Sequence, residues 1–178
     1  MFKIKNINAG LIILKKINTD YYALIGSNII DSKKVYKFSG GKYISLDKTA
    51  LHTAVRQFIE QIFNIKISST KIDEIVKGII KNKLLLNEYV YVPNIIMTYF
   101  GSFKVLNYIY KEIYNQKLNI YNFFSSRNKN MDYISNTSSK LSKISLSRIK
   151  DLLTTHTKFK RITKLILFRI KIIFNIKS

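Results

Sequence analysis

The chain has 178 residues, of which 47% are hydrophobic and 13% aromatic, which is enough for one domain with a packed core and an extension. It contains no cysteine, which excludes disulfides, thiolate zinc sites and cysteine nucleophiles and fits an intracellular, reducing compartment. Lys and Arg number 31 against 10 Asp and Glu, a net charge of +21, so we expect a polyanionic partner: nucleic acid or an acidic membrane surface.

The composition leaves one alternative to a polyanionic partner open and limits other classes. A coding bias towards Lys, Ile and Asn would raise the charge without selecting a partner. The shortage of acids argues against a metal-dependent enzyme, because hard cations need carboxylates. Residues 1–8 are too polar for a secretory signal, and no run of eighteen uncharged apolar residues predicts a transmembrane helix.

The first forty residues have the pattern of a β-hairpin followed by a third strand. The runs Ala9–Lys16 and Tyr21–Ser27 are rich in β-branched and aromatic residues and are separated by a polar turn. Val35–Phe38 is a third short strand that ends at Ser39-Gly40-Gly41, and Gly41–Ile44 is a candidate fourth strand.

The segment Leu46–Phe63 is the clearest helix. Its apolar residues recur at spacings of three and four and form one stripe: Leu51, Ala54, Val55, Phe58, Ile59 and Ile62. Asp47 lies where an N-cap or first-turn acid is favoured. We expect Gln57, Glu60 and Gln61 to share the opposite, exposed face.

The second half of the chain is predicted to alternate helices and strands. The expected helices and strands are a helix over Lys71–Asn82, strands over Leu84–Val92 and Ile95–Phe100, and helices over Ser102–Asn115 and Leu146–Leu153. Arg127–Ser145 is rich in Ser, Asn and Lys and is expected to be a long exposed loop. His52 and His156 have no partner at metal-ligand spacing and are expected at the surface or at the rim of the site.

The stretch from Phe38 to Ile65 resembles the Nudix box. That pattern is a glycine, five residues, an acid, seven residues, then Arg-Glu-apolar-any-Glu-Glu, any residue and a glycine. Here Gly41 is followed after five residues by Asp47, and Arg56 to Gln61 (RQFIEQ) stands where the Arg-Glu core belongs. The spacing from Asp47 to Arg56 is one residue too long, and the last glycine is missing.

The resemblance implies a Nudix-like α/β/α sandwich with a mixed sheet over residues 1–153, followed by a basic C-terminal helical tail over residues 154–178. In the family, three glutamates on this helix hold Mg²⁺ or Mn²⁺ against a diphosphate, and the arginine ties the helix to the preceding loop. The acids map onto Gln57, Glu60 and Gln61, so only Glu60 keeps a carboxylate. Gly40, Gly41 and Lys42 occupy the phosphate-binding turn, and Glu60 is the one metal ligand that the motif retains.

Three functions follow from this pattern. The first is a degenerate Nudix-fold protein that is catalytically weak or inactive and needs no cofactor. Such a protein would serve as a binding or structural component in a nucleic-acid-rich assembly. The second is an active hydrolase that cleaves a nucleoside diphosphate or RNA-cap phosphoanhydride with Mg²⁺ or Mn²⁺, using Glu60, Asp47 and another acid. The Gly-Gly-Lys turn and the lysine-rich composition are similar to those of Nudix decapping proteins of large DNA viruses, which would place the chain in a virion or nucleoprotein assembly.

The third function is a membrane-surface protein held by residues 157–178, which alternate cations with Ile, Leu and Phe. Six cations of the tail are candidate contacts to a polyanion or partner: Lys158, Lys160, Arg161, Lys164, Arg169 and Lys171. A final helix packed on the protein's own core is the structural alternative.

Overall fold

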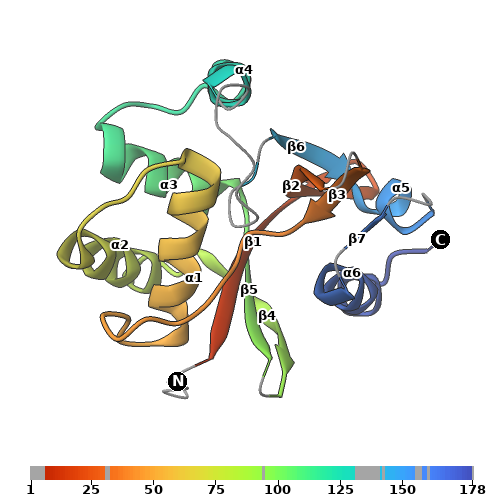
Figure 1. The fold of residues 1–178 in the computed structure, drawn as a ribbon, viewed down its shortest axis with the longest axis horizontal. Coiled ribbons are helices and arrows are strands. Elements are labelled where there is room, and N and C mark those ends of the chain that lie inside the picture. Colours follow the sequence, from red (N-terminus) through yellow and green to blue (C-terminus); the bar gives the residue numbers. More distant parts are fainter. Residues whose placement is uncertain are drawn as a thin grey trace. The chain divides into compact units, whose positions relative to one another are not determined.

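The computed structural model describes residues 7–30, 33–93, 95–130, 141, 143–154, 158–159 and 161–177. The contacts divide the chain into two compact units. The first contains the chain up to Ile13 and Ser39–Asn119, and the second contains Leu14–Phe38 and Ile120–Ser178. Strand β1 (Asn8–Ile17) contributes its first part to one unit and its last part to the other (Figure 1). The domain boundary at residue 153 stays a prediction.

The first unit is built on a mixed sheet. β1 runs parallel to β5 (Ile96–Gly101), and β5 is antiparallel to β4 (Leu85–Val92). Helices α1 (Ala50–Phe58), α2 (Ser69–Lys81) and α3 (Phe103–Tyr114) lie together beside this sheet, where α1 and α3 contact β5 (Figure 1). The predicted strands and helices between residues 71 and 115 are therefore confirmed to within about two residues, the usual spread of element boundaries.

The helix that carries the motif is shorter at its start than the periodicity predicted. It consists of α1 and a π-helical turn, η1 (Ile59–Phe63), which together we call the box helix. Its N-cap is Thr49, whose side chain accepts a hydrogen bond from the His52 N–H, so the prediction that Asp47 caps the helix is wrong. Asn64 ends the helix in the left-handed conformation (φ 57°), which asparagine tolerates better than most residues.

The predicted phase of the box helix is confirmed on its apolar side and only partly on its polar side. All six residues of the predicted stripe are buried. Gln57 and Glu60 are partly exposed, but Gln61 is buried at 7% exposure, so the three do not share one exposed face. The reason is a long-range contact, since Gln61 reaches the backbone of Gly40.

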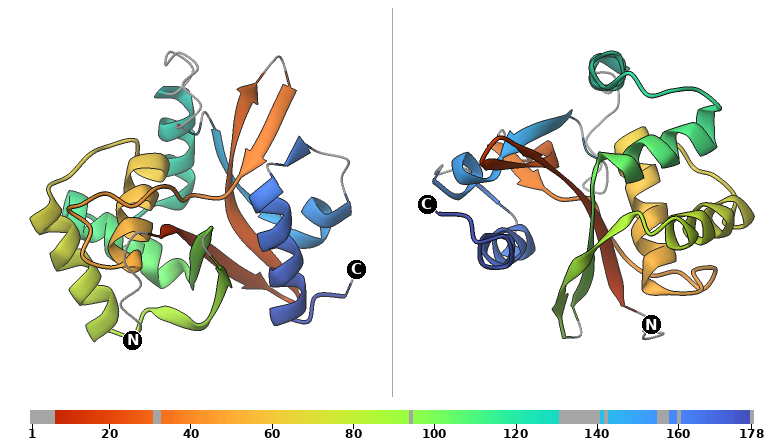
Figure 2. Two further views of the ribbon diagram at one scale, coloured as in Figure 1. Left: turned by 60° about the horizontal axis from the view of Figure 1, so that its bottom comes forward. Right: turned by 180° about the vertical axis from the view of Figure 1, so that it is seen from behind.

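The second unit is mostly antiparallel. β2 (Asp20–Ile30) pairs with the end of β1, with β3 (Lys33–Lys37) and with β6 (Lys143–Arg148), each antiparallel, whereas the short β7 (Lys158–Phe159) runs parallel to β3. The hairpin between β1 and β2 is confirmed, with Asn18 in its turn at φ 54°. Figure 2 shows the same strands with α5 (Ile149–Thr154) and α6 (Arg161–Ile173).

Several predictions in the second unit and the loop before the box helix need correction. The segment Arg127–Ser145 is not one loop, because α4 (Ile120–Asn130) covers its start and β6 its end, and residues 131–140 lie outside the described part. Residues 146–148 belong to β6 rather than to a helix, because they pair with β2. Gly41–Ile44 forms no strand beyond one bridge between Ala9 and Gly41.

The predicted helical tail is present as α6, which contacts α5 and β7. Thr163, Ile166, Leu167 and Ile170 are buried on one face of this helix. The alternative prediction, that the last helix packs on the protein's own core, is therefore confirmed for this face of α6. Within the described part of the chain, no helix is long and apolar enough to cross a membrane.

The turn Ser39-Gly40-Gly41, which we call the glycine turn, lies directly against β1. Ala9 and Gly41 exchange two backbone hydrogen bonds of 3.0 Å, and the Ser39 hydroxyl donates to the Leu11 carbonyl. A side chain at Gly10 would meet the Ser39 carbonyl oxygen at 2.5 Å, closer than atoms pack. Glycine at position 10 thus allows the turn to approach the strand.

Gly10→Ala should therefore lower the free energy of unfolding by about 1–3 kcal/mol, because either the turn or β1 must shift. Urea denaturation would measure the change. Ser69→Ala, at an exposed position in the first turn of α2, is the control and should stay within about 0.5 kcal/mol. Equal stability of both variants would show that the close approach is not a constraint.

Candidate functional site

The ion pair between Arg56 and Asp47 ties the box helix to the loop before it. The Arg56 Nε donates to Asp47 Oδ1 at 2.9 Å and its Nη2 to Oδ2 at 2.7 Å, a two-point contact. The same Nη2 donates to the Lys42 carbonyl at 2.8 Å. The Asp47 side chain is only 3% exposed and also accepts from the Ile44 N–H at 3.1 Å and the Thr53 hydroxyl at 2.9 Å.

These contacts decide the charge state of both groups. Burial acts to raise the pKa of Asp47, but the hydrogen bonds from Arg56, Ile44 and Thr53 outweigh it and hold that pKa below its ordinary value. Burial likewise acts to lower the pKa of Arg56, and Asp47 and then Glu60 outweigh it and raise that pKa. Asp47 is therefore an ionised carboxylate whose oxygens are committed to protein donors. The tie that the resemblance implied for Arg56 is present.

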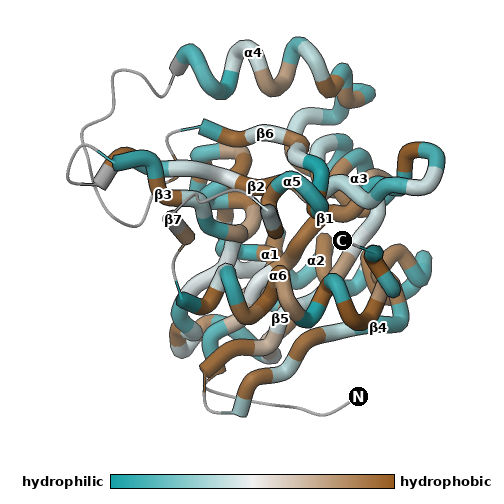
Figure 3. The backbone as a smooth tube through the Cα atoms, turned by 90° about the vertical axis from the view of Figure 1, so that its right-hand side faces the viewer, coloured by the Kyte–Doolittle hydropathy of each residue, from teal (hydrophilic) through white to brown (hydrophobic). Residues whose placement is uncertain are grey.

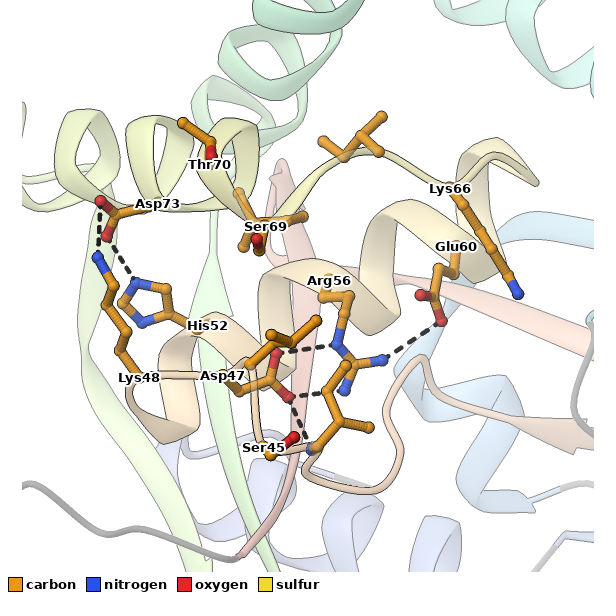
Figure 4. A pocket seen from close by; sticks show the side chains of 14 residues that line it. Ser45, Asp47, Lys48, His52, Arg56, Glu60, Lys66, Ser69, Thr70 and Asp73 are labelled. Carbon is orange, nitrogen blue, oxygen red and sulfur yellow. Dashed lines mark hydrogen bonds and ion pairs between the residues drawn. The ribbon is translucent and has the colours of Figure 1, made fainter.

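Glu60 faces a pocket of about 680 Å³ on the Arg56 side of the box helix (Figure 4). Its carboxylate lies 3.5 Å from Arg56 Nη1, a long ion pair, and its side chain is 29% exposed. The pocket is bounded by the loop around residues 44–48 and by residues 66–73, including the exposed Lys66. Its acids and cations are mixed, and Asp47, Arg56 and Glu60 all line it.

Gln57 and Gln61 are held at the glycine turn instead. The Gln61 amide accepts from the Gly40 N–H at 3.2 Å and donates to the Gly40 carbonyl at 3.0 Å, and it also donates to Gln57 Oε1 at 2.9 Å. The Gln57 side chain lies against Gly41, where an added Cβ would meet Gln57 Oε1 at 2.5 Å. One amide therefore binds both polar groups of a single backbone residue.

The predicted phosphate-binding turn is largely engaged by the protein itself. The Gly40 N–H donates to Gln61, and the Gly41 N–H donates to the Ala9 carbonyl. Lys42 is exposed, with its carbonyl bound to Arg56. The backbone N–H groups of Gly40 and Gly41 are thus occupied, whereas the exposed Lys42 side chain could contact a phosphate.

The donor set does not fit the Mg²⁺ or Mn²⁺ site that the family motif implies. Mg²⁺ and Mn²⁺ prefer several carboxylate oxygens, and two of the three mapped acids are amides bound to the glycine turn or to each other. Asp47 is committed to Arg56, Thr53 and Ile44. Across the described residues, no three His, Asp or Glu side chains gather closely enough to hold a metal ion.

A second polar cluster borders the pocket, and the sequence pattern did not reveal it. His52 is only 8% exposed and lines the pocket, so of the two predicted positions it takes the rim and not the open surface; His156 is outside the described residues. The His52 ring bonds Thr49 at 2.8 Å and Asp73 at 3.1 Å, and Asp73 also pairs with Lys48 and Lys77. Hydrogen bonds from Lys77, Lys48 and His52 hold the pKa of Asp73 well below its ordinary value.

Four of the six predicted tail cations lie in α6. Arg161, Lys164 and Arg169 are exposed on this helix, and Lys171 is partly exposed. Lys158 is in β7, and Lys160 is outside the described residues.

Comparisons with known proteins find likeness only at the level of structure. No protein-family model matches the chain, and no curated protein matches it. The crystal structure of a NUDIX hydrolase from Alicyclobacillus acidocaldarius is similar over 100% of this chain and 99% of that chain, with 13% sequence identity and a TM-score of 0.47. A MutT/nudix family protein from Enterococcus faecalis is similar over 57% of this chain and 38% of that chain, with 9% identity and a TM-score of 0.33.

The α/β fold with a mixed sheet that the sequence predicted is confirmed. Strands β1 to β3 lead to a glycine turn, the box helix follows, and Arg56 ties that helix to the intervening loop. Parallel and antiparallel pairs of strands make the sheet mixed.

Breaking the Arg56–Asp47 pair should destabilise the protein in a pH-dependent way. Asp47→Asn should lower the free energy of unfolding by about 3 kcal/mol at neutral pH, because it leaves a largely buried guanidinium without its counter-charge. The folded pKa of Asp47 lies below its ordinary value, so its contribution is complete above about pH 5 and is lost as the pH falls through the folded pKa.

Urea denaturation between pH 7 and pH 2 would measure the free energy of unfolding of the wild type and of Asp47→Asn. The difference between the two free energies should become smaller as the pH falls. Asp151→Asn is the control, because that side chain is 56% exposed in its pair with Arg148, and should cost less than about 1 kcal/mol. A gap that does not change with pH would contradict the role given to the Asp47 carboxylate.

Proposed function

We propose that this chain is a degenerate Nudix-like protein that acts as a binding or structural component rather than as a metal-dependent hydrolase. The observation that carries the proposal is the Gln61 amide, which accepts from the Gly40 N–H and donates to the Gly40 carbonyl. A residue in this arrangement holds the glycine turn to the box helix. The catalytic helix of the family thereby becomes a structural element.

The contact of Gln61 needs an amide and not a carboxylate. An ionised glutamate could accept from the Gly40 N–H, but it would set a negative charge against the Gly40 carbonyl, which lies 3.0 Å from the Gln61 donor. A bound cation would be required to relieve that repulsion. Glutamine gives the turn a neutral, fully hydrogen-bonded neighbour, and it cannot act as a general base.

An active hydrolase is disfavoured by the arrangement of the remaining acids. That alternative needs Glu60 and Asp47 to bind a metal together with an acid from elsewhere. Asp47 is held by Arg56 and is nearly inaccessible, and Glu60 faces the Arg56 side of the pocket. Both carboxylates are thus engaged by Arg56.

We propose nucleic acid as one polyanionic partner, because the sequence predicted nucleic acid or another polyanion from the surplus of positive charge. If every one of the 10 acids paired with a different cation, 31 − 10 = 21 Lys and Arg side chains would still lack a carboxylate. Such a surplus releases counterions when the protein meets a phosphate backbone. No base-reading motif is present in the sequence, so binding with little sequence preference is proposed; the viral setting stays a prediction.

Phosphoanhydride hydrolysis should be absent or very slow with Mg²⁺ or Mn²⁺, because the metal-binding acids are replaced. The measurement is release of product from a panel of nucleoside diphosphate derivatives and capped RNA. Turnover on the order of 1 s⁻¹ or more, an ordinary enzyme rate, would overturn the proposal.

The double variant Gln57→Glu and Gln61→Glu is the companion test. Without metal it should lose about 1–3 kcal/mol of stability, because the donor to the Gly40 carbonyl is gone, and Mn²⁺ should raise its melting temperature. Gln116→Glu, an exposed position that adds a negative charge away from the turn, is the matched control and should show neither effect.

Binding to mixed-sequence RNA and DNA should be strong at low salt and fall steeply as salt rises. A protein that makes six phosphate contacts should lose about a thousandfold in affinity between 50 and 200 mM salt. Fluorescence anisotropy at several salt concentrations would measure the slope. Absence of binding to both nucleic acids at low salt would contradict the proposed partner. Truncation at residue 157 is a poor variant, because it removes the buried face of α6.

A further inference from the structure

Helix α6 has two apolar faces, and only one of them is covered. Thr163, Ile166, Leu167 and Ile170 are buried. Leu165, Phe168 and Ile172 are 42%, 59% and 57% exposed. These three residues, which we call the outer stripe, are spaced by three and four positions and therefore share one side of the helix. Exposed branched and aromatic side chains in a row are unusual for a folded surface.

Cations flank the outer stripe on both sides. With 3.6 residues per turn, Lys164 and Lys171 fall along one edge of the stripe and Arg169 along the other, while Arg161 stands at its N-terminal end. Residues 155–178 contain no Asp or Glu. Along α6, Figure 3 shows apolar and hydrophilic segments in alternation. The outer face is thus an apolar strip with a positive margin and no negative charge of its own.

We propose that the outer stripe of α6 is a docking surface for an anionic lipid bilayer. Leu165, Phe168 and Ile172 would enter the boundary between headgroups and acyl chains, and the flanking cations would meet lipid phosphates and carboxylates. A helix that lies in the plane of the interface needs this combination of apolar and cationic side chains. The buried face keeps α6 fixed to α5 and β7, so the folded protein presents a preformed surface.

Two other occupants match the surface less well. A nucleic acid would neutralise the cations but would leave three large apolar side chains against a charged phosphate backbone. A second copy of this chain, packed stripe against stripe, would bring the cationic margins of two α6 helices together without an acid to neutralise them. A lipid bilayer can bury the apolar strip and can also neutralise its positive margin with anionic headgroups.

The proposal does not rest on the inactivity of the box helix, because α6 and that helix belong to different units. It is also separable from nucleic-acid binding, which depends on the charge of the whole chain. A hydrolase could carry the same surface. Failure of either proposal would leave the other unchanged.

The experiment uses the full chain and vesicles of phosphatidylcholine with or without about one third phosphatidylserine. The triple variant Leu165→Gln, Phe168→Gln and Ile172→Gln should lower binding to anionic vesicles at least about tenfold, because the buried apolar area is lost. Lys164→Gln with Arg169→Gln should lower it about fivefold per charge. Ile80→Gln, an exposed apolar position on α2, is the matched control and should bind like the wild type.

The chain has no tryptophan, so Phe168→Trp adds a single reporter that preserves an aromatic side chain. Its emission should shift to the blue with anionic vesicles and be quenched by brominated acyl chains. This variant keeps the test decisive if the triple variant does not fold.

Four results would overturn the proposal. Two concern vesicles: binding of the Phe168→Trp variant without quenching by brominated acyl chains, or binding of the triple variant that equals that of the wild type. The other two are a blue shift in the emission of the Phe168→Trp variant with RNA alone, and a wild-type dimer that becomes monomeric in the triple variant. Residual vesicle binding in high salt, at which RNA is released, would support it, because apolar insertion resists screening.

Discussion

The ion pair between Arg56 and Asp47 is the constraint on which the arrangement of the site depends. Asp47 gathers donors from the loop and from the box helix, and Arg56 returns to the loop through the Lys42 carbonyl. Because both side chains are nearly buried, neither can be lost without leaving an uncompensated charge. The pair fixes the loop of residues 42–48 on the box helix, and this loop forms one wall of the pocket. The pair therefore sets the position of the loop that carries Lys42 relative to the box helix.

Two positions of the box helix carry amides where the motif that it resembles has carboxylates. Glutamine and glutamate have nearly the same size, but only the amide can donate and accept at once. Gln61 both accepts from and donates to Gly40, and it donates a third hydrogen bond to Gln57. The glycine turn is thereby held by hydrogen bonds where the family motif implies a divalent cation. The amides of Gln57 and Gln61 are thus complementary to the turn.

The surroundings of the Lys and Arg side chains differ between parts of the molecule. In the first unit, some cations are paired with acids, as Lys48 and Lys77 are with Asp73. On α6 the cations border an apolar strip and have no acids in the same segment. Net charge alone predicts attraction to any polyanion. Only the pattern of apolar and charged side chains on one helix face distinguishes a lipid surface from a phosphate backbone.

The sequence by itself determined the β1–β2 hairpin, the buried stripe of the box helix and the pairing of Arg56 with the loop, because each depends on local spacing or on a short motif. It could not determine that Gln61 is buried, that His52 bonds Asp73, or that residues 146–148 join a sheet. Gln61 and Gly40 are 21 residues apart, as are His52 and Asp73, and β6 pairs with a strand more than a hundred residues earlier. Periodicity indicates which side of an element is apolar, whereas the partner of a polar side chain is decided only when distant segments meet. Asp47 illustrates the difference: its local position predicted an N-cap, but the guanidinium of Arg56 draws it into an ion pair and leaves the cap to Thr49.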